Sequence, residues 1–454
     1  MSLKSVSRSE ARAFGTDGHE NRSQESSVKG VLLALLAGGI LFAQEREPVP
    51  EEGWWHSKEA GRYTAIEPAA EPWRWVEEAE LDATLRAFWI DEHFASQKTT
   101  ATALGGFFGI RTPELHGFSA YANLFVSQRL WGINPDADEV LNETPYDGSS
   151  GFAYLGEAAV IYRDGGVAFR AGRMKLQTPF ADEDDIGMVP NTFEGAVCDY
   201  EYGDVAALHL LYLTRWAGFD STDENGDQSG FKAFAPDSAG LLAAGAVYSP
   251  DGKNEYNAWY YRTDRLFDLL YLEAAGHYDF TPQWHIEWGV QAAGMAELAS
   301  SGIGGTVTGT MALLHYGSVY AGGAFNYADV SQGHYVTDGF GGGPYYTSLD
   351  ESTIAGVSEL GPGHDVSVWR AGGGADIAWW PHGEEEGMHL EAVYGRFDLV
   401  GTDVSIDEKD LVFWLSAAEH LRLTAVLAYF DIRNAPAAYD GDFRRFRVRL
   451  DYVF

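Results

Sequence analysis

The sequence predicts an all-β protein, a transmembrane antiparallel β-barrel of about eighteen strands. Three observations support this prediction. Large apolar residues alternate with small or polar residues in runs of roughly eight to twelve, which is the pattern of strands with two different faces. Aromatic residues make up 14% of the 454 residues, and 53 residues are glycine. The connections between the runs are long on one side and short on the other, as in outer-membrane barrels.

The first and last runs show the alternation clearly. In the first, Leu81, Leu85 and Trp89 share one face, whereas Asp82 and Arg86 share the other. In the last, apolar residues at 446, 448, 450, 452 and 454 alternate with polar residues at 445, 447, 449 and 451. The expected strands are 81–91, 101–111, 117–128, 153–163, 166–173, 195–203, 204–215, 240–248, 256–263, 268–279, 282–293, 305–314, 318–328, 366–379, 387–398, 409–417, 420–430 and 443–454.

The connections sort by parity. The four longest, near 129–152, 174–194, 216–239 and 329–365, all follow odd-numbered strands. Connections after even-numbered strands are short and turn-like, as at Asp164-Gly165-Gly166. This asymmetry predicts long outer loops and short periplasmic turns. The terminal Phe454, on the apolar face, is typical of bacterial outer-membrane barrels.

The chain is expected to have three parts. Residues 1–43 are expected to be a secretory signal peptide, because a 13-residue apolar run at 31–43 follows Lys29. The polar leader before that run is long for a signal, so translation is expected to start at Val28. Residues 44–80 form an acidic lead-in, rich in Trp and Pro, that is expected to lie in the periplasm, and 81–454 form the barrel.

Composition excludes several other classes. The sequence has 67 acidic and 31 basic residues and a formal charge of −36, which argues against binding nucleic acid. The single cysteine, Cys198, cannot form an intramolecular disulfide. A helical membrane protein is excluded, since no apolar run reaches about 18 residues. The common motifs of serine hydrolases, zinc proteases and phosphate-binding loops are absent, so no enzyme activity is expected.

Arginines are expected on the inner face of adjacent strands. Alternate residues on a strand are about 7 Å apart, so the last strand places three arginines in one column, and its neighbours add more. Forked guanidiniums in this arrangement could guide anionic groups through a pore. The alternative is that they pair with Asp82, Asp451 and neighbouring acids to satisfy a polar lumen. The expected pore-lining basic residues are Arg86, Arg170, Arg422, Arg445, Arg447 and Arg449.

A calcium site in an outer loop is a weaker hypothesis, and no obligatory cofactor is expected. The spacing Asp-x-Asn-x-Asp-x-Ser resembles the first half of a calcium loop, although the glycine and the final glutamate of such a loop are missing. A solvated loop is the alternative. The candidate ligands are Asp223, Asn225, Asp227 and Ser229.

The stretch 170–197 resembles the OprD-type family of outer-membrane porins. The matching pieces are Gly172-Arg173, Gln177-Thr178-Pro179 and Pro190-Asn191-Thr192-Phe193-Glu194-Gly195, with support from 101–106, 115–120 and Gly341-Gly342-Gly343-Pro344. The resemblance covers 81–454. It implies an eighteen-stranded barrel whose third outer loop folds into the lumen and narrows the pore.

The third loop also contains four consecutive acids. Such a loop facing a basic wall would set up a transverse field, whereas the alternative is a solvated acidic loop tip. The expected constriction-loop residues are Pro179, Asp182, Glu183, Asp184, Asp185, Pro190, Asn191 and Phe193.

The resulting hypothesis is a porin in the outer membrane of a Gram-negative bacterium. It would allow passive, partly selective diffusion of small hydrophilic solutes such as amino acids, small carboxylates or peptides. The expected partners are these solutes, membrane lipid and lipopolysaccharide, with the barrel a monomer or a homotrimer. The alternatives are an outer-membrane barrel enzyme with a protease or lipase site at the outer rim, and a secreted β-rich adhesin.

Overall fold

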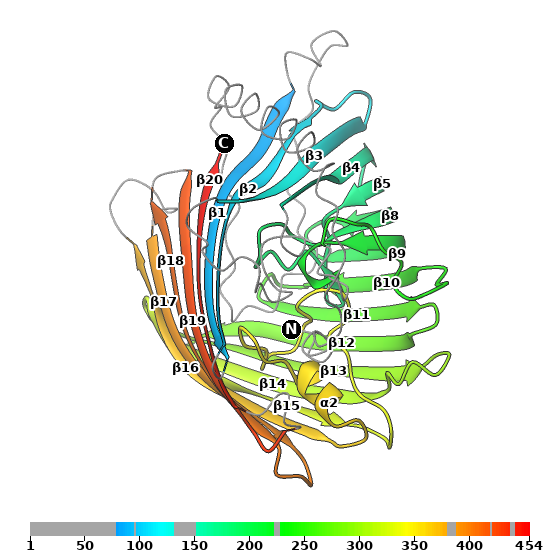
Figure 1. Ribbon diagram of the computed structural model, residues 1–454. Coiled ribbons are helices and arrows are strands. Elements are labelled where there is room, and N and C mark those ends of the chain that lie inside the picture. The colour runs from blue at the N-terminus through cyan, green and yellow to red at the C-terminus, as the bar shows by residue number, and fades with distance from the viewer. Residues whose placement is uncertain are drawn as a thin grey trace, which may run out of the picture.

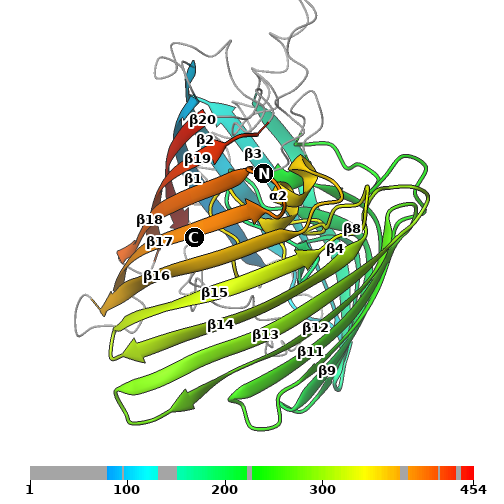
Figure 2. The same ribbon diagram turned by 90° about the horizontal axis from the view of Figure 1, so that it is seen from below.

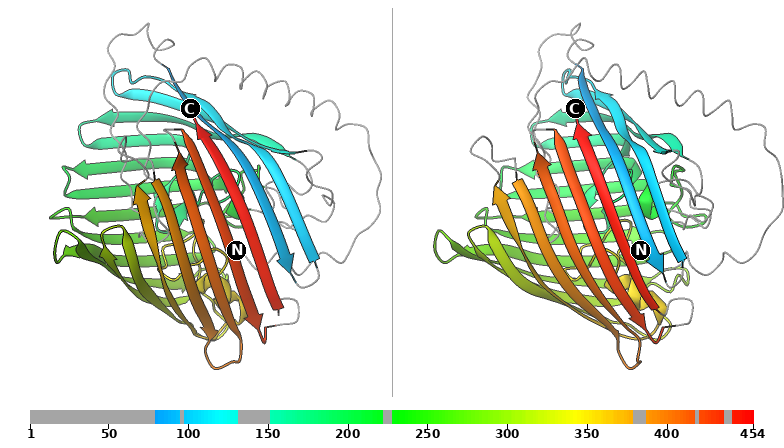
Figure 3. Two further views of the ribbon diagram at one scale, coloured as in Figure 1. Left: turned by 90° about the vertical axis from the view of Figure 1, so that its left-hand side faces the viewer. Right: turned by 60° about the vertical axis from the view of Figure 1, so that its left-hand side comes forward.

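The computed structural model describes residues 79–94, 97–130, 151–221, 228–378, 387–417, 420–435 and 441–454. Within these ranges, eighteen antiparallel strands form one closed barrel (Figure 1). The first strand pairs with the second on one side and with the last strand on the other, which closes the sheet. In Figure 3 the last strand, in red, lies beside the first, in blue.

The barrel strands confirm the prediction from sequence, since each expected range overlaps one strand. They are β1 (Glu80–Phe94), β2 (Gln97–Arg111), β3 (Phe118–Arg129), β4 (Phe152–Asp164), β5 (Val167–Met174), β8 (Thr192–Tyr202), β9 (Ala206–Ala217), β10 (Leu241–Tyr248), β11 (Asn254–Thr263), β12 (Phe267–Asp279), β13 (Trp284–Glu297), β14 (Gly305–Tyr316), β15 (Val319–Asp329), β16 (Val366–Ala378), β17 (Gly387–Leu399), β18 (Ser405–Ala417), β19 (Leu421–Arg433) and β20 (Gly441–Val453). The sequence did not predict four short elements, β6 (Gln177–Thr178), β7 (Ala181–Asp182), the 3-10 turn η2 (Phe219–Ser221) and helix α2 (Ile354–Leu360).

The two faces of the barrel differ in polarity. On β20, Arg445 and Arg447 point inward and are buried, whereas Leu450 and Tyr452 point outward and are 40% and 39% exposed. An apolar outer face suits lipid, and a closed sheet leaves no unpaired edge inside a bilayer. None of the helices in the described ranges is long and apolar enough to cross a membrane.

Two outer loops fold into the lumen. The third loop, residues 175–191, joins β5 to β8, and the seventh loop, residues 330–365, joins β15 to β16 and contains α2. In Figure 2, α2 lies behind the strands of the near wall. Both loops contribute to the largest cluster of buried apolar residues, through Leu176 and Phe180 from the third loop and Phe340 and Tyr345 from the seventh. The inward fold of the third loop was predicted, whereas that of the seventh was not.

Candidate functional site

The third loop begins with a small β6–β7 hairpin whose tip is anchored by aromatic packing. Phe180, 1% exposed, makes edge-on ring contacts with Tyr261 of β11 and Tyr271 of β12, each at 5.6 Å between ring centroids. Its third aromatic neighbour is Tyr345 of the seventh loop, at 5.9 Å. This end of the loop therefore packs against the wall formed by β11 and β12.

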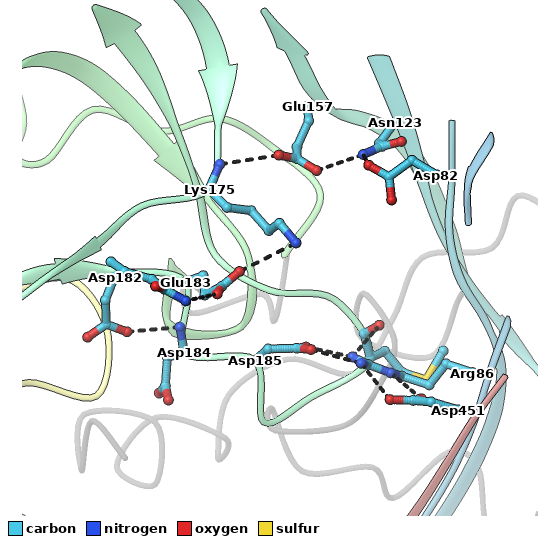
Figure 4. Close-up of polar contacts among 12 residues, drawn as sticks. Asp82, Arg86, Asn123, Glu157, Lys175, Asp182, Glu183, Asp184, Asp185 and Asp451 are labelled. Carbon is cyan, nitrogen blue, oxygen red and sulfur yellow. Dashed lines mark hydrogen bonds and ion pairs between the residues drawn. The ribbon is translucent and has the colours of Figure 1, made fainter. Parts of the chain in front are cut away.

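The other end of the loop reaches the opposite wall. Asp185 receives two hydrogen bonds from Arg86 of β1, at 2.6 and 2.8 Å, and lies 3.8 Å from Arg449 of β20. Arg86 also binds Asp451 at 2.7 Å and donates to the carbonyl oxygen of Gly187 at 2.9 Å (Figure 4). Of the eighteen strands of the barrel, β12 is the ninth from β1 in either direction around the sheet, so the two strands lie on opposite sides of the lumen. The third loop therefore crosses the full width of the lumen.

The four acids of the loop have separate surroundings. Asp182 accepts from the backbone N–H of Asp184 at 2.8 Å, and its own N–H donates to the carbonyl oxygen of Phe340 in the seventh loop. Glu183 accepts from Gln177 at 2.8 Å. Asp185 differs from the others because it faces the arginines. Its partial burial opposes ionisation, but the charges of Arg86 and Arg449 outweigh burial and lower the pKa of the carboxyl.

Lys175 holds the start of the loop. Its backbone N–H donates to Glu157 of β4, and its ammonium lies 3.5 Å from Glu183. Burial lowers the pKa of Lys175, but the charges of Glu183 and Glu157 outweigh it and raise the pKa. Asn123 of β3 bridges Glu157 to Asp82 of β1, at 2.8 and 3.1 Å (Figure 4). This network ties the loop to β1, β3 and β4.

The motif residues near both ends of the loop are buried. Pro179 and Pro190 are buried, and the side chain of Asn191 exchanges hydrogen bonds with Asp220, donating to its carboxylate at 2.7 Å and accepting from its N–H at 3.1 Å. Burial, with the nearby charge of Asp184, raises the pKa of Asp220 to about 8. Phe193, at the start of β8, stacks on Trp216. The motif therefore holds the loop to the barrel.

All six predicted arginines lie on inward-facing positions, but most are engaged with acids. Arg445 binds Glu92 of β1 at 2.5 Å and also Glu351 of the seventh loop. Arg447 pairs with Asp350 of the seventh loop. Arg449 lies 3.2 Å from Asp451. The other two are Arg422, opposite Asp451 in the β19–β20 register, and Arg170, which lies on β5, 3.7 Å from Asp199.

This arrangement differs from the expected one, in which an acidic loop faces a basic wall across the pore. Asp185 touches the wall directly, and the side chains of Arg86 and Arg447 are only 2% and 9% exposed. The side chains of Arg449 and Asp185 remain 15% and 29% exposed. Their role in selecting solutes stays a prediction.

The sequence did not predict the acids of the seventh loop. The backbone N–H groups of Asp350 and Glu351 donate to Asp410 and Glu408 of β18, at 3.1 and 2.8 Å. The Gly341-Gly342-Gly343-Pro344 motif is the sequence signal for the packing of the seventh loop on the third. Gly341 has φ of 137°, and a Cβ there would lie 2.7 Å from Oδ1 of Asp182. A glycine is therefore needed where the seventh loop packs on the third.

Of the calcium candidates, Asp223, Asn225 and Asp227 lie outside the described residues, as does nearly all of 1–80.

The outer rim does bring a serine, a histidine and a glutamate together. Nδ1 of His334 lies 3.3 Å from the hydroxyl of Ser331, and Nε2 lies 3.1 Å from Glu297. However, Nδ1 also lies 3.1 Å from the carbonyl oxygen of Gln332, and hydrogen bonding to Glu297 and Gln332 raises the pKa of His334. The hydroxyl of Ser331 and the carbonyl oxygen of Gln332 therefore share one ring nitrogen of His334.

No family model matches the chain, and no curated protein matches it by sequence. Solved structures do match. Acinetobacter baumannii OccAB4 has a TM-score of 0.69 at 12% identity, covering 83% of this chain and 98% of its own. Pseudomonas aeruginosa OccK8 (OprE) has 0.66 at 15%, covering 83% and 98%, and Pseudomonas aeruginosa OpdK, solved with vanillate, has 0.67 at 16%, covering 83% and 99%. These are OprD-type porins, so the resemblance read from the motifs is confirmed for the fold.

Proposed function

We propose that the chain is an outer-membrane porin of a Gram-negative bacterium, through which small hydrophilic solutes diffuse passively. The observation that carries this proposal is the closed eighteen-stranded barrel, whose lumen is lined by charged residues and crossed by the third loop from β12 to β1. Such a barrel has an apolar face for lipid and a polar face for water. The loop narrows the path, and charge near it decides which solutes pass.

Small carboxylates are the proposed preferred solutes, with amino acids and peptides in the same class. Arg449 is the partly exposed arginine nearest the tip of the third loop, at 3.8 Å from Asp185. Guanidinium binds carboxylate through paired hydrogen bonds and stays charged at any working pH. OpdK was solved with vanillate, an aromatic carboxylate, which supports this class. The proposal needs no cofactor and no chemical step.

The test is single-channel recording. The mature chain is purified in detergent and added to a planar lipid bilayer with a salt gradient. Reproducible conductance steps are expected, with a reversal potential that reports the preferred ion, and removal of residues 180–188 should raise the conductance. A protein that is folded, as shown by a heat-dependent shift on a gel, yet gives no current would contradict the porin and leave the barrel.

A further inference from the structure

A second cluster of chemically active side chains lies on the inner wall, away from the third loop. His285 and Glu287 are alternate residues of β13, and His315 of β14 is the direct pairing partner of His285. Alternate residues and direct partners in an antiparallel pair share a face, so the sheet brings all three side chains together. Their neighbours in the same alternation, Gly289 and Leu313, are buried, which places this face toward the lumen.

The three side chains converge within bonding reach of one ion. One ligand atom from each residue can be chosen so that all lie within 4.8 Å of one another. Oε1 of Glu287 lies 3.3 Å from Nε2 of His315 and 3.8 Å from Nε2 of His285. The two imidazole rings stack at 4.2 Å between centroids with 15° between their planes.

Nε2 of His315 is buried and has no hydrogen-bond partner among the described residues. When the ring of His315 carries its proton on Nδ1, Nε2 presents a lone pair to the carboxylate of Glu287, and a cation between the two atoms stabilises this arrangement. Zinc bonds to histidine nitrogen and carboxylate oxygen are about 2.0–2.2 Å, so two ligands of a tetrahedral ion are about 3.3–3.5 Å apart. The measured 3.3 Å meets this spacing, and 3.8 Å meets it after a small side-chain rotation.

We propose that His285, Glu287 and His315 bind one divalent transition-metal ion of the zinc type. Two imidazoles and one carboxylate suit zinc, copper and nickel, whereas calcium and magnesium prefer oxygen ligands alone. Three protein ligands leave a fourth position for water. His277 of β12 is the pairing partner of Glu287.

The site lies at the end of the barrel with the short turns. β13 begins at Trp284 and β14 ends at Tyr316, and these two aromatic residues pack together on the outer face, 41% and 52% exposed. Such pairs mark the membrane interface, so the metal would be bound at the periplasmic mouth. A fixed positive ion there would repel cations leaving the pore and attract anions.

The experiment is a zinc titration of the full untagged chain in detergent, by calorimetry. One zinc per chain is expected, and an excess of magnesium should not displace it. Glu287→Gln and the double change His285→Ala with His315→Ala should each weaken binding at least as much as loss of an outer-shell partner does, roughly 10–100-fold. His364→Ala, which removes a histidine of the seventh loop, is the matched control and should bind as the unchanged chain does. Folding of each variant is checked by its heat-dependent gel shift.

Two results would overturn the site. One is that the unchanged chain binds no zinc, and the other is that the variants bind it as tightly as the control. Cobalt gives a readout that needs no variant, since a four-coordinate nitrogen and oxygen site produces visible absorption that zinc abolishes. The absence of that absorption would also overturn the proposal. Because neither readout needs ion flow, a failed site and a failed porin can be told apart.

Discussion

The third and seventh loops fold into the same lumen and end on arginines of the same wall, but they are held differently. The third loop reaches that wall through Asp185, 29% exposed, and its partner Arg86 keeps a second carboxylate in Asp451. The seventh loop reaches it through Asp350, whose side chain is 1% exposed and pairs with Arg447 at 9%. In the first contact the arginine has a second carboxylate and the loop acid is partly exposed, whereas in the second both partners are buried.

The two contacts on this basic wall are expected to differ in how much stability is lost when each is broken. A buried ion pair is costly to break from one side, since the remaining charge is left in a poorly solvated place. The Arg86–Asp185 pair should cost less to break, because Asp451 still compensates the charge of Arg86. The seventh loop is therefore expected to act as fixed packing and the third as the adjustable part of the pore.

The largest expected effect comes from the buried contact between Asp350 and Arg447. Asp350→Ala leaves the buried guanidinium of Arg447 without this carboxylate and should destabilise the barrel by about 3–5 kcal/mol. The measurement is the urea concentration at which the folded gel band disappears in lipid vesicles. Asp279→Ala is the control, because the Asp279–Lys253 pair is about half exposed and breaking it should cost little stability.

Replacing both partners sharpens this prediction. Asp350→Leu combined with Arg447→Met removes both buried charges and should recover most of the lost stability. Equal losses for Asp350→Ala and Asp279→Ala would refute the role of the seventh loop as fixed packing.

Loss of the contact between Asp185 and Arg86 should affect single-channel current more than stability. Asp185→Ala leaves Arg86 bound to Asp451, so the loss of stability should be smaller than for Asp350→Ala. The third loop loses its carboxylate contact with β1 but keeps the bond from Arg86 to the Gly187 carbonyl oxygen, and Arg86 and Arg449 lose a neutralising charge. Single-channel conductance and the anion-to-cation permeability ratio should both rise. Glu183→Gln is the control, since Glu183 bonds within the loop, and a change of the same size in both variants would argue against Asp185 as the anchor.

The strands could be predicted from sequence because each carries its own evidence. Alternation along one run predicts both a strand and the direction of its side chains. This is why the inward direction of Arg445 and Arg447 on β20 could be predicted alongside the strand itself. The third loop was predicted for another reason, because its motif resembles that of a known family.

The seventh loop shows where this reasoning stops. Asp350 and Glu351 sit in an irregular segment with no period, and their partners on β20 are about 95 residues away in the chain. Such contacts depend on how the loop folds inside the barrel, which local pattern does not encode. The zinc-type cluster was missed for a related reason. His285 and His315 become neighbours only through the β13–β14 register.

A smaller effect is expected from the wall itself. Arg449→Ala removes a partly exposed charge and should lower the anion-to-cation permeability ratio, by up to about fivefold if one charge at ~4 Å in water is worth about 1 kcal/mol. Arg447→Ala should change the ratio less, because Asp350 already neutralises it. The measurement is the reversal potential in a salt gradient. If Arg447→Ala has the larger effect, exposure does not decide which arginine the solute meets.

The smallest expected effect concerns pH at the base of the third loop. Burial and the charge of Asp184 raise the pKa of Asp220 to about 8, from 3.8 in the unfolded chain. The folded protein thus keeps a proton that the unfolded chain has lost, and this contribution to stability is complete at low pH and is lost as pH rises through about 8. The urea midpoint should fall from pH 6 to pH 8 and then level off. Asp220→Asn keeps an acceptor for Asn191 and removes the titration, so its midpoint should fall less over that range. Parallel curves of urea midpoint against pH for the two proteins would show that Asp220 is already ionised in the folded protein. The contact between Asp220 and Asn191, which holds the third loop to the barrel, would then carry no proton on the carboxyl.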